Sequence, residues 1–404
     1  MPFRLPSLAT IKHVVHPARH WLAGAALFLL ALALRTRFRC GFVLGDDVEE
    51  FAMLRHILNT GPDWHNQIVL RFGVWLFTFI SSRLFGLSET TFFLPTLLLS
   101  SSLSAIAYCI FVAHGHSVRR AFLQSLMVVT APFEVLMGVV HSNDLFLTWC
   151  LAVGYLALIR FESRPMVQGI TLGLLLWFGF YIKLWVVYLF PALALYFAGC
   201  FLRKRSPHGA AAFAATSAVL HGTTSVIWKL QLGTFVPFLR THAATYPVDY
   251  RDLPDLFLTY PRQLFVGSEF GTTLFGVVPY ILIFLLAGKV CMFFWVRKRG
   301  PECDSGLARW DRLDLSLLAL YGSFFLLLNF FPNTFVFDRY YSAPRIFRYL
   351  TPVSFFMTVH AGKMLVDLYL DLSIRNPGLI RLARPEALVF GACVLFLNVA
   401  QARE

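Results

Sequence analysis

Four carboxylate side chains occupy five consecutive positions of this chain, directly after its first apolar run: Asp46, Asp47, Glu49 and Glu50. A carboxylate beside a membrane could act as a general base toward a hydroxyl group. Aspartate is also common at the start of a helix, where it caps backbone N–H groups. The apolar residues between Phe51 and Leu58 fall on one side of a helix, which predicts a short amphipathic helix at the membrane interface. The residue types alone leave both roles of Asp46 open.

Two more charged residues occur at the edges of apolar runs. Asp144 ends the sequence His-Ser-Asn-Asp before the run that starts at Leu145, where it could cap a helix or serve as a second acidic site residue. Lys183 lies within the apolar stretch 178–190. An ammonium group there is costly unless it snorkels to the interface or pairs with an anion, for which a lipid phosphate is a suitable partner.

Arginines supply the remaining candidates. Arg345 and Arg348, with Tyr349, precede a late apolar run, and the planar guanidinium group matches the oxygens of a phosphate. Arg71 and His65 are weaker candidates for contact with a phosphate or an acceptor. The histidines show no metal-ligand spacing on a shared helix.

The elements that position these residues are predicted to lie in a membrane. Of 404 residues, 57% are hydrophobic and only 14% are charged, which excludes an ordinary soluble protein. The apolar runs are about 20 residues long, which predicts α-helices rather than the shorter strands of a barrel. The net charge of +13 resides in short clusters between these runs, which indicates contact with anionic lipid and not with nucleic acid. The seven cysteines show no pattern of a disulfide framework or a zinc site.

We expect a single transmembrane domain over residues 1–404, with about eleven membrane-spanning helices and no soluble C-terminal domain. Residues 40–88 form a first outer loop with interfacial helices, the second of them at 67–86, and residues 229–271 form a long outer loop. The predicted spans lie at about 21–38, 91–113, 121–140, 145–159, 167–182, 184–202, 210–228, 272–296, 313–331, 349–366 and 387–397.

Basic clusters set the orientation. With a cytoplasmic N-terminus, five successive basic loops face the cytoplasm, and Asp144, Lys183 and Arg348 share the outer face. A rival topology has an outer N-terminus and a spanning 67–86 segment. It leaves the later loops unchanged but places the acidic stretch inside.

The order of these motifs resembles the GT-C superfamily of polyprenyl-phosphate-sugar-dependent glycosyltransferases, nearest the protein O-mannosyltransferase and lipid A aminoarabinose transferase group. The motifs are the acidic pair Asp46-Asp47 after the first span, the sequence RLFGLSE at 83–89, Asp144 after the third span, Lys183 between two later spans, and RYLTP at 348–352. The resemblance extends from Leu22 to Lys363. The usual acidic pair of the group is Asp-Glu, and many members carry a soluble C-terminal domain.

The resemblance implies transfer of a sugar from a polyprenyl phosphate donor to a hydroxyl of a glycan, lipid or protein acceptor, without a metal cofactor. It implies an all-α GT-C bundle in a bacterial inner membrane, with the active site facing outward. The implied site has Asp46 as general base and Asp144 as a second catalytic carboxylate, Asp47 and Glu50 as secondary acidic residues, and Lys183, Arg345, Arg348 and Tyr349 at the lipid phosphate. A transporter or flippase of lipid-linked saccharides is the alternative, although no internal repeat is evident.

Overall fold

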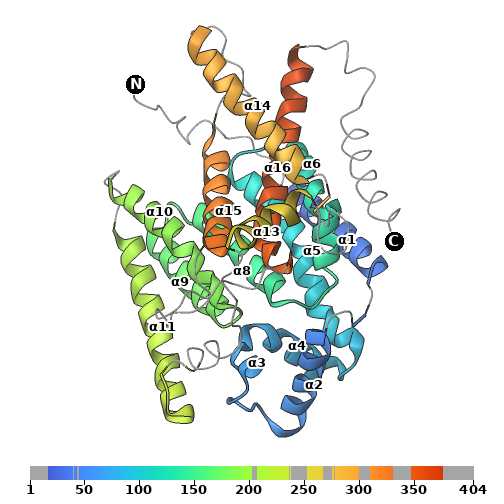
Figure 1. The fold of residues 1–404 in the computed structure, drawn as a ribbon, viewed down its shortest axis with the longest axis vertical. Coiled ribbons are helices and arrows are strands. Elements are labelled where there is room, and N and C mark those ends of the chain that lie inside the picture. The colour runs from blue at the N-terminus through green and yellow to red at the C-terminus, as the bar shows by residue number, and fades with distance from the viewer. Residues whose placement is uncertain are drawn as a thin grey trace.

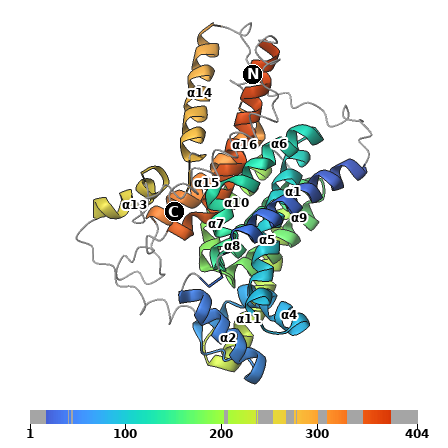
Figure 2. The same ribbon diagram turned by 90° about the vertical axis from the view of Figure 1, so that its right-hand side faces the viewer.

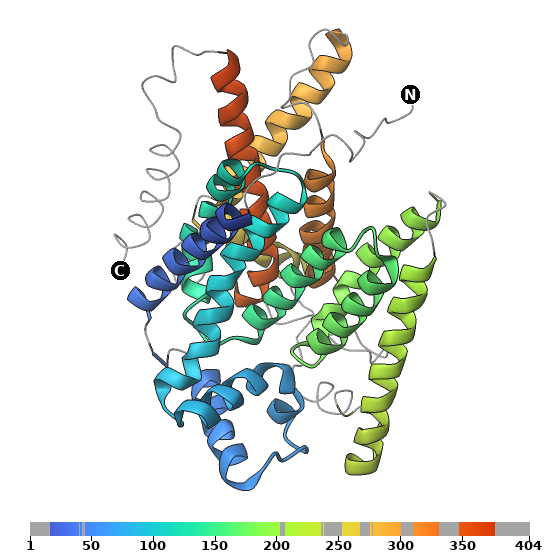
Figure 3. The same ribbon diagram turned by 180° about the vertical axis from the view of Figure 1, so that it is seen from behind.

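The structure is a computed structural model that describes residues 17–39, 41–42, 45–202, 207–235, 237, 253–266, 275–276, 278–299, 310–330 and 347–375. All regular structure in these ranges is helical (Figures 1 and 3). The elements are α1 (Pro17–Arg37), α2 (Gly45–Thr60), α3 (Gln67–Leu70), α4 (Phe72–Phe85), α5 (Glu89–Ala113), α6 (Val118–Thr130), α7 (Pro132–Met137), α8 (Asn143–Arg160), α9 (Pro165–Phe180), the 3₁₀ helix η2 (Leu184–Leu189), α10 (Phe190–Leu202), α11 (His208–Leu232), α13 (Leu253–Phe265), α14 (Val278–Arg299), α15 (Arg312–Phe330), the 3₁₀ helix η6 (Phe347–Leu350) and α16 (Thr351–Arg375).

Over the described ranges, seven helical segments are long and apolar enough to cross a membrane. The chain is therefore an integral, multi-pass membrane protein of the all-α class, as the composition predicts. The predicted count of about eleven spans stays a prediction, because the span at 387–397 lies outside the described residues. Helix α13 occupies part of the predicted long outer loop 229–271.

Two segments that the sequence predicts as continuous helices are broken. The span predicted at 121–140 divides into α6 and α7 at Ala131, whose backbone is extended (φ −58°, ψ 129°). Pro132 explains this break, since proline disfavours helical backbone at the preceding residue. The interfacial helix predicted at 67–86 divides into α3 and α4 at Arg71 (φ −85°, ψ 51°). Arg71 is therefore the non-helical residue between α3 and α4.

Helix α16 is the centre of the bundle. Every residue from Thr351 to Met364 is buried, so the helix is enclosed on all sides. It packs against α15, α6, α14 and α8. The short helix η6 leads directly into it, which carries Arg348 and Tyr349 to one end of the central helix.

Helices α2, α3 and α4 form a platform at one end of the molecule, opposite the projecting C-terminal ends of α14 and α16 (Figures 1 and 2). The platform has its own apolar core, which includes Met53, Ile57, Val69 and Trp75. The indole N–H of Trp75 donates to the carbonyl of Val69 at 2.8 Å and holds α4 against α3. With 14 residues, α4 is shorter than the spanning helices.

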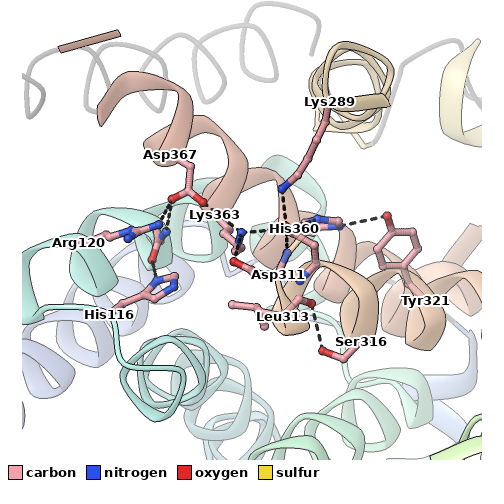
Figure 4. Close-up of polar contacts among 12 residues, drawn as sticks. His116, Arg120, Lys289, Asp311, Leu313, Ser316, Tyr321, His360, Lys363 and Asp367 are labelled. Carbon is pink, nitrogen blue, oxygen red and sulfur yellow. Dashed lines mark hydrogen bonds and ion pairs between the residues drawn. The ribbon is translucent and has the colours of Figure 1, made fainter. Parts of the chain in front are cut away.

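A network of charges centred on the buried Lys363 and Asp314 joins the helices toward the other end of the bundle (Figure 4). Nζ of Lys363 in α16 is fully buried and lies 2.7 Å from Asp314, 2.8 Å from Asp311 and 3.0 Å from Asp367. Asp314 also pairs with Lys289 of α14 and with His360, and Asp367 pairs with Arg120 of α6 at 2.5 Å. The network thus ties α6, α14 and α15 to the central helix.

Candidate active site

Lys183 lies at the corner between α9 and η2, with extended backbone (φ −159°, ψ 131°). Its Nζ donates to Asp144 Oδ1 at 2.6 Å. The same atom lies 3.9 Å from the ring centroid of Trp185 and 3.9 Å from that of Tyr349. The ammonium group is therefore enclosed by one carboxylate and two aromatic rings, and the predicted phosphate residues Lys183 and Tyr349 are in contact.

Asp144 is free to make this contact because another residue caps its helix. The hydroxyl of Ser142 accepts from the backbone N–H of Asp144 at 3.2 Å and is the N-cap of α8. Asp144 sits in the first turn with 2% of its side chain exposed. Of the two roles that the sequence left open for Asp144, the structure assigns the cap to Ser142 and brings the Asp144 carboxylate to Lys183.

Glu50 of α2 meets the segment that precedes Asp144. Its Oε2 lies 2.9 Å from Nε2 of His141, which is buried, and Nδ1 of His141 lies 2.8 Å from Oγ1 of Thr96. The imidazole ring packs against Phe92, with centroids 4.4 Å apart. These contacts fasten the helix that contains Asp46 to the segment that leads into α8.

Arg71 reaches the same group of residues through Asn143. With its amide oxygen turned toward Arg71, Asn143 accepts from Nη1 of Arg71 at 2.9 Å and donates to Oε1 of Glu50 at 3.3 Å. The start of α4 also rests on the Lys183 corner, because the N–H of Gly73 donates to the carbonyl of Tyr181 at 3.2 Å. The platform therefore adds a second cation to the site.

Arg348 is a third cation that acts on Lys183, and its guanidinium carbon lies 5.8 Å from the ring of Tyr349. Lys183 lies between the membrane-spanning segments, and burial lowers its pKa to about 8. Asp144 opposes this shift, while the positive charges of Arg348 and Arg71 add to it. Lys183 thus has two further cations nearby and one carboxylate partner, Asp144, while Glu50 is joined to Arg71 through Asn143. A cluster of this kind could hold an anion.

Not every predicted residue can be placed. Asp46 lies in the first turn of α2, but its side chain is outside the described part of the chain, and so is all of Arg345. Asp47 is fully buried, and its assignment as a secondary acidic residue stays a prediction. His65 is exposed, and its backbone N–H donates to Asp63 at 3.1 Å, so it takes no part in the Lys183 cluster.

Sequence reasoning did not assign His141 or Trp185 to the site and ranked Arg71 low. For Arg71 the available signal was a charged residue within an apolar segment, the same signal that identified Lys183. The sequence motif His-Ser-Asn-Asp placed His141 next to Asp144, but its partner Glu50 is 91 positions away in the chain and gave no local sign.

An apolar cavity of about 700 Å³ lies among the helices that follow Asp144 and Lys183 in the chain. It is enclosed by α8, α9, α10 and α15, and leucines such as Leu151, Leu176 and Leu318 form most of its wall. Leu189, at the end of η2, also lines it, so this short helix leads from Lys183 into the cavity. Tyr155 and Ser316, which are hydrogen-bonded to each other, line it as well.

No family model matches this chain, and no curated protein matches it in sequence. Among solved structures, the crystal structure of ArnT from Cupriavidus metallidurans in the apo state matches with a TM-score of 0.56 at 15% identity, over 86% of this chain and 60% of that chain. The structure of the same protein bound to undecaprenyl phosphate matches with a TM-score of 0.54 at 14% identity, over 95% of this chain and 69% of that chain. This chain thus spans about two thirds of the length of those structures. ArnT is the lipid A aminoarabinose transferase, a GT-C glycosyltransferase, and so the predicted resemblance is confirmed at the level of the fold.

Proposed function

We propose that this protein transfers a sugar from a polyprenyl phosphate donor to a hydroxyl group of an acceptor at the outer face of a bacterial inner membrane. The observation that carries the proposal is Lys183, paired with Asp144 and within the field of Arg71 and Arg348, at the start of a short helix whose last residue lines an apolar cavity. A polyprenyl phosphate has an anionic phosphate group, which the cations would hold, and an apolar tail, which the cavity would hold. The likeness in fold to ArnT, which has been crystallised with undecaprenyl phosphate, supports the same ligand class.

The phosphate and the lipid tail are assigned to adjoining parts of the molecule. Lys183 and Arg348 hold the phosphate, with Arg71 and the predicted Arg345 as further cations. The tail lies in the apolar cavity beyond η2, where leucine side chains replace lipid contacts. The acceptor approaches from the platform side, which contains Asp46.

In the transfer step, the carboxylate of Asp46 accepts the proton of the acceptor hydroxyl, and the oxygen attacks the anomeric carbon of the donor sugar. The bond between that carbon and the phosphate oxygen breaks, and its electron pair leaves with the polyprenyl phosphate. The cations stabilise the added negative charge on the phosphate. Glu50, through His141 and Asn143, fixes α2 against the start of α8 and so holds the base over the reacting atoms. No metal ion is part of this proposal, since Asp144 already has a cationic partner in Lys183.

Two substitutions test the assignment in the full-length protein. Asp46→Asn removes the base and is expected to lower transfer by about 10²–10⁴-fold while undecaprenyl phosphate still binds. Lys183→Met removes the central cation and is expected to abolish binding of undecaprenyl phosphate. Transfer is measured as release of free undecaprenyl phosphate from a panel of radiolabelled undecaprenyl phosphate sugars.

Matched controls are available on the same surfaces. Asp63→Asn removes an exposed carboxylate of the platform loop, and Lys229→Met removes an exposed lysine of α11. Both are expected to behave like the unaltered protein. Full transfer by Asp46→Asn would refute the base assignment, and transport of donor lipid without release of polyprenyl phosphate would identify a flippase instead.

The outward orientation has its own test. Val48, next to the acidic pair, has 55% of its surface exposed. In a chain whose seven cysteines are replaced by serine, Val48→Cys is expected to react with a membrane-impermeant maleimide added to the outside of intact cells. Reaction only after the cells are opened would place the acidic stretch on the cytoplasmic side.

A further inference from the structure

The ammonium group of Lys183 already has a full set of partners. An ammonium has three N–H donors and no acceptor. Asp144 Oδ1 takes one donor at 2.6 Å, and the rings of Trp185 and Tyr349 approach the same nitrogen at 3.9 Å each. Only 12% of the side chain is exposed. A phosphate oxygen can reach hydrogen-bond distance of Nζ only if one of these three groups moves away.

Charge decides which group moves. The aromatic rings are neutral and remain compatible with a neighbouring phosphate, whereas the carboxylate of Asp144 would lie within a few ångströms of a second anion. Among the described residues, the carboxylate has besides Lys183 one weak side-chain contact, a hydroxyl of Ser142 at 3.5 Å from Oδ2. Asp144 is therefore held mainly by the ammonium that the phosphate needs.

We propose that Asp144 occupies the phosphate position in the empty site, pairing with Lys183 until the donor phosphate displaces it. This inference rests on the proposed function and adds the order in which donor and acceptor bind. While the site is empty, Lys183 masks the Asp144 carboxylate. Once the donor is bound, the carboxylate is released beside Asn143 and Glu50, where it accepts a hydrogen bond from the acceptor hydroxyl. Binding of the donor then precedes productive binding of the acceptor.

If the Asp144 carboxylate competes with the donor phosphate for Lys183, removal of its charge should strengthen binding of undecaprenyl phosphate. Asp144→Asn keeps the shape of the side chain but not its charge, and is expected to bind undecaprenyl phosphate about tenfold more tightly at pH 6.5, although transfer is lost. The dissociation constant is measured on the full chain in lipid nanodiscs with undecaprenyl phosphate as the probe. The same gain is expected in a Lys183→Arg background, where the partner remains charged at any working pH.

Glu50→Gln is the matched control. It removes one negative charge from the same site, but its partners are His141 and Asn143 and not Lys183. A general effect of charge would raise affinity equally in both variants, whereas displacement predicts a clearly larger gain for Asp144→Asn. Asp144→Ser provides a second variant with the same expected gain should Asp144→Asn fail to fold.

The outcomes separate the two proposals. If the unaltered protein binds undecaprenyl phosphate through Lys183 and Asp144→Asn binds with equal or lower affinity, the displacement is refuted and the proposed function stands. An equal gain in Glu50→Gln also refutes it. If the unaltered protein does not bind undecaprenyl phosphate, the proposed function itself is refuted.

Discussion

Lys183 is largely buried, and the proposed binding of a phosphate requires its side chain to be positively charged. Burial lowers its pKa from the 10.5 of an ordinary lysine to about 8. The neighbouring arginines add to this shift, and Asp144 opposes it. The protonated ammonium is the form that binds a phosphate. The ligand-free protein therefore loses this form as the pH rises through about 8, well before an exposed lysine would.

Donor binding should follow that titration. Between pH 7 and 8 the affinity of the unaltered protein for undecaprenyl phosphate is expected to change little, and above pH 8 to fall by about tenfold per pH unit. Equilibrium binding from pH 7 to 9.5 measures this. Lys183→Arg is the control, because a guanidinium stays protonated and should give a flat profile. A flat profile in the unaltered protein would contradict the role of the Lys183 ammonium.

The residue scale also shows where sequence reasoning succeeds. Lys183 could be selected as a candidate, and its pairing with Asp144 anticipated as a need for an anion, because a charge within an apolar run has few structural explanations. The competing cap role of Asp144 could not be excluded, since Ser142 and Asp144 are both good N-cap residues and only the fold shows which one accepts the N–H.

Among the elements, the junction of α4 with the Lys183 corner is the tightest contact of the site. A Cβ atom built on Gly73 would lie 2.6 Å from Cγ1 of Ile182 and 3.1 Å from the carbonyl oxygen of Phe178. Only glycine allows the start of α4 to approach so closely, and this approach brings Arg71 beside Lys183. The sequence predicts an interfacial helix here but not the break at Arg71, because no proline or glycine at that position marks it.

Gly73→Val tests this junction. The larger side chain is expected to push α4 away from the corner, at a cost of about 1–3 kcal/mol, and to weaken binding of undecaprenyl phosphate. Gly222→Val in α11 is the control, since a Cβ atom there meets no atom within 4 Å. Thermal unfolding and lipid binding are measured together in detergent. Unchanged binding in Gly73→Val would show that Arg71 does not depend on this contact.

Across the whole molecule, α16 connects two charged regions about 20 Å apart, since 14 residues separate Tyr349 from Lys363 along a helix that rises 1.5 Å per residue. Tyr349, just before α16, contacts the ammonium of Lys183, and Lys363, halfway along α16, lies among three carboxylates. Most of the spans could be predicted from hydropathy alone. The ion pairs could not, because Arg120 and Asp367 are 247 positions apart and hydropathy does not say which helices are neighbours.

The buried network should therefore control the stability of the bundle. Lys363→Met leaves Asp314 and its neighbours without their central cation, and removal of one partner from a buried ion pair typically costs about 3–5 kcal/mol. We expect a lower thermal unfolding midpoint in detergent for Lys363→Met and little change for Lys229→Met, whose lysine is exposed. The double variant Lys363→Met/Asp314→Asn should recover little of the loss, because it also leaves the buried Lys289 without its carboxylate partner. An unchanged midpoint in Lys363→Met would mean that α16 is held by its apolar surface alone.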